Sequence, residues 1–359
     1  MKPRKFLEKN VLQASRDRIS MIFDEFETII VSISSGKDST VLYYLCLQEA
    51  VRRNRKIIAF FLDQEAEYQA SINLIRKQMR HPNVIPNWYQ VPIYMTNSTS
   101  MDEYFLYAWG EQEAWIREKD PIAIHAIKES YPKRFYPFFK WYESNSPEAA
   151  HLIGLRTEEG ITRFRAVTKY PGWKGHRWST VRNEVVRFYP IYDWTVYDVW
   201  KFIYDYNLPY NKIYDLMFWD NYSIYQKMRV SNLIHEKSFR CLADLPKYEP
   251  ETYNALCQRI SGIRTAARYA TEKLVFDNKQ LPRHYHNWKE FRDFLLDNLQ
   301  HEDHRQKFVQ RFSKQPQTEQ VYQAQVGQLL INDYENSTTF DTKKAQKWKQ
   351  IREKWWNIL

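Results

Sequence analysis

Apolar runs alternate with amphipathic segments along the first 215 residues. Short, nearly continuous apolar runs are typical of strands buried on both faces, and they predict strands at residues 28–33, 56–62, 88–94, 151–156 and 185–191. Apolar positions at helical spacing predict helices at residues 10–26, 39–53, 69–80 and 195–206. Because strands and helices alternate, we expect a doubly wound α/β fold with a mainly parallel sheet.

Two segments interrupt this alternation. Residues 95–147 are rich in aromatic residues and proline, and they predict an irregular helical insertion over the sheet edge. Residues 166–187 are basic and contain glycine and tryptophan, which favours a loop that covers the substrate. Residues 216–359 predict a helical C-terminal region. It ends in a basic aromatic helix at 343–356 that either packs on the domain or contacts nucleic acid or a protein partner.

Composition narrows the possible functions. Apolar residues make up 43% of the chain, which is enough for a real core. The formal net charge of +10 favours anionic ligands such as nucleotides or nucleic acid. No apolar run reaches the length of a membrane span and no export signal follows Met1, so we expect a cytoplasmic protein without membrane contact. Three cysteines do not suggest a disulfide framework.

A small-residue loop lies between the strand at 28–33 and the following helix. Backbone N–H groups at a helix N-terminus are unpaired, and the helix dipole adds positive charge there. Lys37 supplies a full charge, and small residues permit close approach of an anion. The loop therefore predicts a phosphate or pyrophosphate site, with binding residues Ser32, Ser34, Ser35, Gly36, Lys37, Asp38 and Ser39.

The spacing differs from that of the Walker loop, in which Gly-Lys is followed directly by Ser or Thr. The loop instead resembles the Ser-Gly-Gly-Lys-Asp-Ser loop of the ATP pyrophosphatase and sulfonucleotide reductase superfamily. Ser35 stands where that family usually has its first glycine. Serine adopts a positive φ less readily than glycine does, so the shape of the loop is an open question at this stage.

Three further signatures extend the resemblance over residues 10–215. They are Asp63 after the second strand, the set Gly154, Arg156, Glu159 and Arg163, and the 190–215 segment, in which Thr195 is the expected helix N-cap and Asp193 is a candidate to face the site. The chain is similar to bacterial phosphoadenosine phosphosulfate reductase-like proteins, including the immunoglobulin-binding regulator A group. The resemblance implies an adenine nucleotide alpha hydrolase-like fold over residues 1–215.

The same resemblance assigns roles to residues. It implies that Gly154 lies near the base or ribose of a nucleotide and that Arg156 and Arg163 face phosphate or sulfate oxygens. It also implies a magnesium ion held by Asp38 or Asp63, and a ribose is the alternative ligand of Asp63. Lys37, Asp38, Arg156 and Arg163 are then the candidate catalytic residues, and ATP with Mg²⁺ is the expected cofactor pair.

The cysteines argue against reductase chemistry. Sulfonucleotide reductases carry a nucleophilic cysteine in a Glu-Cys-Gly-x-His string, and neither Cys241 nor Cys257 has that context. The remaining family chemistry is adenylyl transfer from ATP with release of pyrophosphate, onto an unknown small-molecule or nucleic-acid acceptor. Two alternatives stay open. One is a sulfonucleotide-binding protein without reductase activity, and the other is a nucleic-acid-associated regulatory or modification-system subunit.

Overall fold

The computed structural model describes residues 7–100, 102–169, 172–224, 228–236, 239–270, 280–336 and 338. The chain divides into two compact units. The first contains residues 1–95 and 107–232, and the second contains residues 96–106 and 233–359. Each is described by itself below. The functional division predicted at residue 215 stays a prediction.

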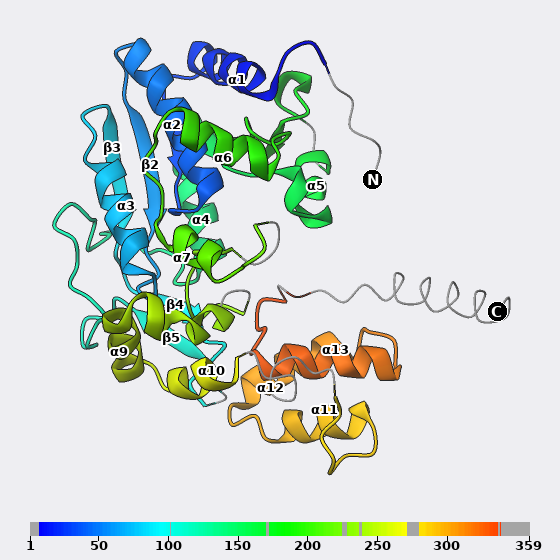
Figure 1. The fold of residues 1–359 in the computed structure, drawn as a ribbon. Helices are drawn as coiled ribbons and strands as arrows, with labels where there is room; N and C mark the ends of the chain where they lie inside the picture. The colour runs from blue at the N-terminus through cyan, green and yellow to red at the C-terminus, as the bar shows by residue number, and fades with distance from the viewer. Residues whose placement is uncertain are drawn as a thin grey trace, which may run out of the picture. The chain divides into compact units, whose positions relative to one another are not determined.

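A six-stranded sheet forms the centre of the first unit (Figure 1). Its strand order is β3-β2-β1-β6-β8-β7, with β1 Ile29–Ser32, β2 Ile57–Leu62, β3 Val84–Tyr89, β6 Ala150–Ile153, β7 Ser179–Arg182 and β8 Val185–Phe188. All neighbouring pairs are parallel except β7 and β8. Val31 lies opposite Ala59 on one side and Leu152 on the other. The predicted mainly parallel α/β fold is confirmed.

Helices cover both faces of this sheet (Figure 1). They are α1 Val11–Glu25, α2 Lys37–Arg52, α3 Gln69–Met79, α4 Phe135–Ser144, α5 Ile161–Thr168, α6 Val196–Asp205 and α7 Ile213–Trp219. Successive side chains of a strand point to opposite faces of the sheet, so β2 contacts helices on both faces. Phe61 joins the main core with α2 residues such as Val41. Phe60 stacks on Tyr142 of α4, with ring centroids 4.1 Å apart.

Helix starts follow the capping signals in the sequence. The Asn10 side chain accepts a hydrogen bond from the Gln13 amide at 2.9 Å and begins α1. Thr195 and Asp198 form a reciprocal capping box at the start of α6, which confirms the predicted N-cap. Helix α2 has no side-chain cap. Its first turn therefore depends on other partners for its amide groups.

The third predicted strand is wrong in its bounds. Strand β3 spans Val84–Tyr89, whereas β4 Ile93–Thr96 pairs with β5 Phe105–Ala108 in a separate two-stranded sheet. Pro92 lies between β3 and β4 and has no amide hydrogen to donate to a ladder. A continuous apolar pattern across 88–94 therefore conceals the end of one strand and the start of another.

The prediction of a covering loop at 166–187 is also wrong for much of that segment. Strands β7 and β8 form an antiparallel hairpin at the sheet edge. Asn183 and Glu184 both have positive φ at the turn, which suits the right-handed twist of the strands. Trp173 and Trp178 pack against Phe188 of β8, with ring centroids 5.6 and 5.4 Å apart. The basic composition of residues 166–187 therefore does not indicate a covering loop here, because much of the segment forms a hairpin at the sheet edge.

The C-terminal part of the second unit, from residue 239, is helical where the structure describes it, as predicted. Its helices are α8 Leu245–Tyr248, α9 Pro250–Arg259, α10 Ile263–Tyr269, α11 Trp288–Asp297, α12 Glu302–Phe312 and α13 Glu319–Leu330. Tyr104 stacks on His304 at 3.9 Å between centroids, and Asn332 donates to the carbonyls of Asn97 and Tyr104. These contacts hold residues 96–106 in the unit.

The basic aromatic helix predicted at 343–356 lies outside the described residues. Within the described part of the chain, every helix is too short or too polar to cross a bilayer.

A buried ion pair joins the hairpin to α4 and generates a stability prediction. Arg187 contacts both carboxylate oxygens of the fully buried Glu143 at 2.5 and 2.6 Å. Replacing Glu143 with alanine leaves a largely buried guanidinium without this partner, which costs about 3–5 kcal/mol of unfolding free energy. Urea denaturation measures the loss. Glu148→Ala, at an exposed neighbouring acid, should change stability by less than about 0.5 kcal/mol. Equal effects of the two substitutions would contradict this account.

Candidate functional site

The 34–39 loop has a residue in the left-handed region at the position where the family pattern has its first glycine. Ser35 has a φ of +57°, in the left-handed region that favours glycine. Its hydroxyl accepts a hydrogen bond from the Asn211 side-chain amide at 3.3 Å. The same amide donates to the Ser71 hydroxyl at 2.8 Å, and the side-chain Oδ1 of Asn211 accepts from the Ile213 backbone amide. Asn211 therefore supports Ser35 in a strained conformation, which explains how the loop accommodates serine in place of glycine.

Hydroxyl groups close the rest of the loop. The Ser39 hydroxyl accepts from the Ser34 amide at 3.2 Å and donates to the Gly36 carbonyl at 3.0 Å. The Ser34 and Ser39 hydroxyls also lie 3.0 Å apart. The Lys37 amide, at the first residue of α2, donates to the Tyr214 hydroxyl at 3.1 Å. A helix N-terminal amide of the kind that binds anions is thus hydrogen-bonded to a phenol hydroxyl.

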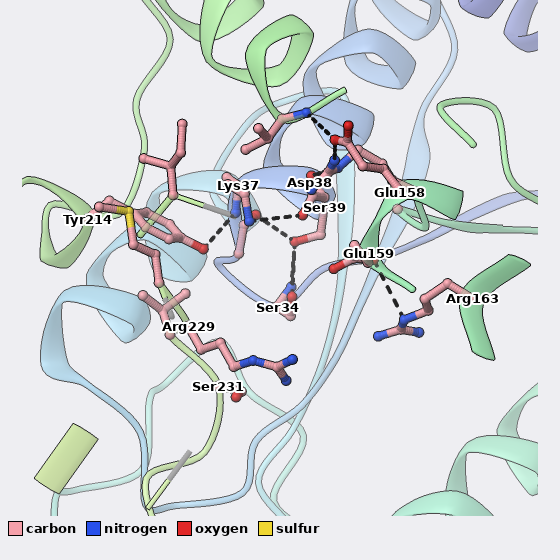
Figure 2. Close-up of a pocket in the computed structure, with 17 residues that line it drawn as sticks. Ser34, Lys37, Asp38, Ser39, Glu158, Glu159, Arg163, Tyr214, Arg229 and Ser231 are labelled. Carbon is pink, nitrogen blue, oxygen red and sulfur yellow. Dashed lines mark hydrogen bonds and ion pairs between the residues drawn. The ribbon is translucent and has the colours of Figure 1, made fainter. Parts of the chain in front are cut away.

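A cavity of about 560 Å³ lies beside this loop. Figure 2 shows the residues that line it, with Lys37, Asp38 and Ser39 grouped on one side and Arg163 and Arg229 reaching it from separate segments. The lining residues are Ser34, Gly36, Lys37, Asp38, Ser39, Gly154, Arg156, Glu158, Glu159, Arg163, Val196, Tyr214, Ile224, Met228, Arg229, Val230 and Ser231. The structure therefore brings most predicted binding residues, and all four candidate catalytic residues, to one space.

A chain of ion pairs crosses the cavity wall. The Lys37 ammonium lies 3.3 Å from one Asp38 oxygen, and the Arg156 guanidinium bonds to the other. Arg156 also donates to Glu158 at 2.9 Å, and Glu158 accepts from the Val196 amide at 2.7 Å. Burial opposes a charged Arg156, but its carboxylate neighbours outweigh burial and raise its pKa above the ordinary value. Asp38 thus positions two cations.

Gly154 has a steric role that its sequence pattern does not specify. A Cβ atom at this position would lie 2.9 Å from the Ser39 Cα and backbone nitrogen, and 3.0 Å from the Asp38 carbonyl carbon. Such distances are shorter than van der Waals contact. The glycine therefore lets the end of β6 approach the first turn of α2, and it also lines the cavity.

Asp63, Ser32 and Ser35 are not among the cavity-lining residues. The Asp63 side chain is fully buried and receives hydrogen bonds from the Glu65 amide, Trp88, Gln90 and Arg117. Asp193 also lies elsewhere, because both its oxygens bond to Arg18 of α1. These acids contribute to the framework of the domain.

The residues present do not fit a magnesium ion held by Asp38 and Asp63. Both oxygens of Asp38 face cations, and both oxygens of Asp63 already accept hydrogen bonds. Among the described residues, no group of three or more His, Cys, Asp and Glu side chains is arranged to hold a metal ion. Binding of magnesium by this pair stays a prediction that the observed geometry does not support.

Several lining residues were not identified from the sequence. Tyr214 belongs to the 190–215 segment, but no role follows from its spacing. Its burial raises the pKa of the phenol, so it remains protonated. Arg229 and its neighbours at 228–231 carry no motif. Only the folded chain brings them to the cavity.

The loop, sheet and cavity define a PP-loop nucleotide-binding fold. The chain belongs to the phosphoadenosine phosphosulfate reductase domain family, whose model matches residues 28–220, more than half of its length. A domain of unknown function, DUF3440, matches residues 223–351. The predicted family is confirmed. The predicted closeness to the immunoglobulin-binding regulator A group stays a prediction.

The chain is 27% identical over 321 residues to the uncharacterized protein YbdN of Escherichia coli K12, covering 82% of this chain and 76% of that one. It is 25% identical over 213 residues to adenosine 5'-phosphosulfate reductase of Bacillus cereus AH187, covering 59% and 78%. Phosphoadenylyl-sulfate reductase of Candida auris aligns with a TM-score of 0.35 and 13% identity, covering 59% and 93%. FMN adenylyltransferase of Candida glabrata aligns with a TM-score of 0.37 and 13% identity, and the alignment covers 64% of this chain and 66% of that one.

The close approach at Gly154 yields a prediction. Gly154→Ala forces β6 away from α2 and should cost about 1–3 kcal/mol of stability in urea denaturation, as overpacking does. Gly36→Ala is the matched control. Its φ of −67° accepts alanine, and the nearest atom to the new Cβ is the rotatable Ser34 hydroxyl at 3.3 Å. If Gly154→Ala were no more destabilising than Gly36→Ala, the proposed steric role would be wrong.

Proposed function

We propose that the protein binds ATP in the cavity and transfers its adenylyl group to an acceptor, with release of pyrophosphate. The observation that carries this proposal is the 34–39 loop. It places a helix N-terminus, Lys37 and the Ser39 hydroxyl at one wall of a cavity whose size suits a nucleotide.

The loop holds the β- and γ-phosphates in this proposal. Backbone amides and the Lys37 ammonium face the phosphate oxygens, and the Ser39 hydroxyl, which lines the same cavity, exchanges its bond to the Gly36 carbonyl for one to phosphate. The Lys37 amide exchanges its bond to the Tyr214 hydroxyl for a bond to phosphate. Because charge-assisted hydrogen bonds are stronger than neutral ones, this exchange favours the bound state.

Chemistry at the α-phosphorus needs no protein nucleophile. An acceptor oxygen forms a bond to the α-phosphorus, and the bond from that phosphorus to the bridging oxygen breaks. The electron pair leaves with pyrophosphate, where Lys37 and the loop amides stabilise the charge. Arg156, held by Asp38 and Glu158, faces the α-phosphate, and the more exposed Arg163 faces the acceptor side. Magnesium enters only as the cation that accompanies ATP, and no step is assigned to it.

The cysteines support transfer over reduction. Cys46 lies in the buried core of α2, where burial raises the pKa of its thiol and keeps it protonated. Cys241 and Cys257 lack the Glu-Cys-Gly-x-His context of the reductase nucleophile. A sulfonucleotide-binding protein without reductase activity is the second candidate, and the match to the reductase domain family favours it.

Thermal-shift titration with ATP and magnesium, against phosphoadenosine phosphosulfate, tests this function. We expect ATP to raise the melting temperature most, because a ligand stabilises the state that it binds. Lys37→Ala should weaken ATP binding about 10- to 100-fold, the effect of about 1.5–3 kcal/mol from a charged hydrogen bond. Lys77→Ala, at an exposed lysine of α3, should leave the shift unchanged. A shift with the sulfonucleotide alone would replace this proposal by the second candidate.

The Tyr214 hydroxyl generates an independent prediction. In Tyr214→Phe the Lys37 amide loses its partner, so the ligand-free protein should be less stable by about 1–3 kcal/mol. ATP then restores a partner to that amide, so its stabilising effect should be larger than in the wild type. Tyr204→Phe, at a tyrosine that is 85% exposed, is the control and should change neither quantity. A smaller ATP effect in Tyr214→Phe would show that the hydroxyl itself binds phosphate.

A further inference from the structure

We propose that the exposed face of α5 binds a single-stranded nucleic acid and that this strand supplies the acceptor oxygen. The binding surface stands on α5 itself, whereas the acceptor role rests on the proposed adenylyl transfer. The surface is defined as Arg163, Phe164, Arg165 and Lys169.

The charge of this region is strongly one-sided. Residues 160–187 contain seven lysines and arginines and one acidic residue, Glu184. Among these cations, Lys174 pairs with Glu25, Arg187 pairs with Glu143 and Arg163 lies near Glu159. The cations of α5 and its C-terminal flank are exposed, and α5 contains no acid. Positive charges repeated along one helix suit a polyanion better than a single small anion.

An exposed aromatic ring lies within this basic face. Phe164 is 48% exposed and stands between Arg163 and Arg165. Val167, three residues after Phe164 and therefore next to it on the helix, packs in a small buried cluster with Leu155 and Tyr189. In an ordinary amphipathic helix, a phenylalanine at this position would be buried. An exposed ring flanked by arginines offers a surface on which a base can stack, and paired bases in a duplex cannot use it in this way.

The same face continues into the cavity. Arg163 belongs to both, and its side chain is 54% exposed while it lies 3.6 Å from Glu159. Figure 2 shows Arg163 and Arg229 on separate sides of the lined space, and Arg229 is also exposed. A strand lying on α5 therefore reaches the cavity at Arg163, which lines it together with Lys37. The acids deeper in the cavity, Asp38 and Glu158, are already bonded to Arg156.

The proposed step balances without another reactant. A terminal phosphate oxygen of the strand forms a bond to the α-phosphorus of ATP, or a base carbonyl oxygen does so while the adjacent ring N–H proton passes to solvent. The bond to the bridging oxygen breaks, and pyrophosphate departs with the electron pair. The products are an adenylylated strand and pyrophosphate, and no electron donor or acceptor is required.

Fluorescence anisotropy with labelled oligouridylate tests the surface on the full chain. Arg165→Glu should weaken binding about tenfold or more, and it should reduce the slope of log affinity against log salt between about 50 and 200 mM salt. Phe164→Ala should weaken binding about tenfold through lost stacking. Arg80→Glu, at the exposed C-cap arginine of α3 outside the cavity, is the charge-matched control and should have the smaller effect. Equal losses for Arg165→Glu and Arg80→Glu would overturn the assignment, and so would tighter binding of a duplex.

Random-sequence RNA and DNA oligonucleotides with ATP labelled at the α-phosphate test the acceptor role. We expect label on one of the two pools with the wild type and none with Lys37→Ala. Absence of label from both pools overturns the acceptor role. The ATP-induced thermal shift distinguishes the two proposals, because Arg165→Glu and Phe164→Ala should retain it. Oligouridylate binding without any ATP shift would contradict the proposed function but leave the α5 surface in place.

Discussion

The ion pair between Asp38 and Arg156 is the interaction on which the candidate site depends. It joins the first turn of α2 to the chain that leaves β6, and it is largely buried. Breaking one side would leave a charge in a poorly solvated place, which is more costly than losing an exposed pair. Because Asp38 also faces Lys37, the same carboxylate sets the positions of both cations beside the loop.

Gly154 and Asn211 make that ion pair geometrically possible. The missing side chain at Gly154 brings β6 against the backbone of α2, and Asn211 supports Ser35 at positive φ before the helix begins. The hydroxyl of Tyr214, three residues after Asn211, accepts a hydrogen bond from the Lys37 amide. The 190–215 segment thus contributes more than packing. It holds the loop in the shape that receives an anion, and one of its hydroxyls pairs with a donor of that loop.

Local patterns in the sequence predict the sheet and the loop, because both depend on residues close together in the chain. They fail where distant residues decide the outcome. Pro92 separates two strands that one apolar run suggests, and the basic 166–187 segment contains an edge hairpin. Asp63 follows a strand, where a ligand-binding residue is expected. However, its carboxylate accepts hydrogen bonds from Arg117, Trp88 and Gln90. The residues at 228–231 reach the cavity only through the fold, and no spacing rule reveals them.

Isothermal titration of the wild-type protein with ATP, inorganic pyrophosphate and AMP tests the central claim most directly. If the 34–39 loop holds the β- and γ-phosphates, ATP and pyrophosphate should both bind, and AMP should bind at least tenfold more weakly than ATP, the effect of about 1.4 kcal/mol. Pyrophosphate should also compete with ATP. Equal affinities for ATP and AMP, with no binding of pyrophosphate, would contradict the account, because the nucleotide would then be held by its nucleoside and the loop would play no part.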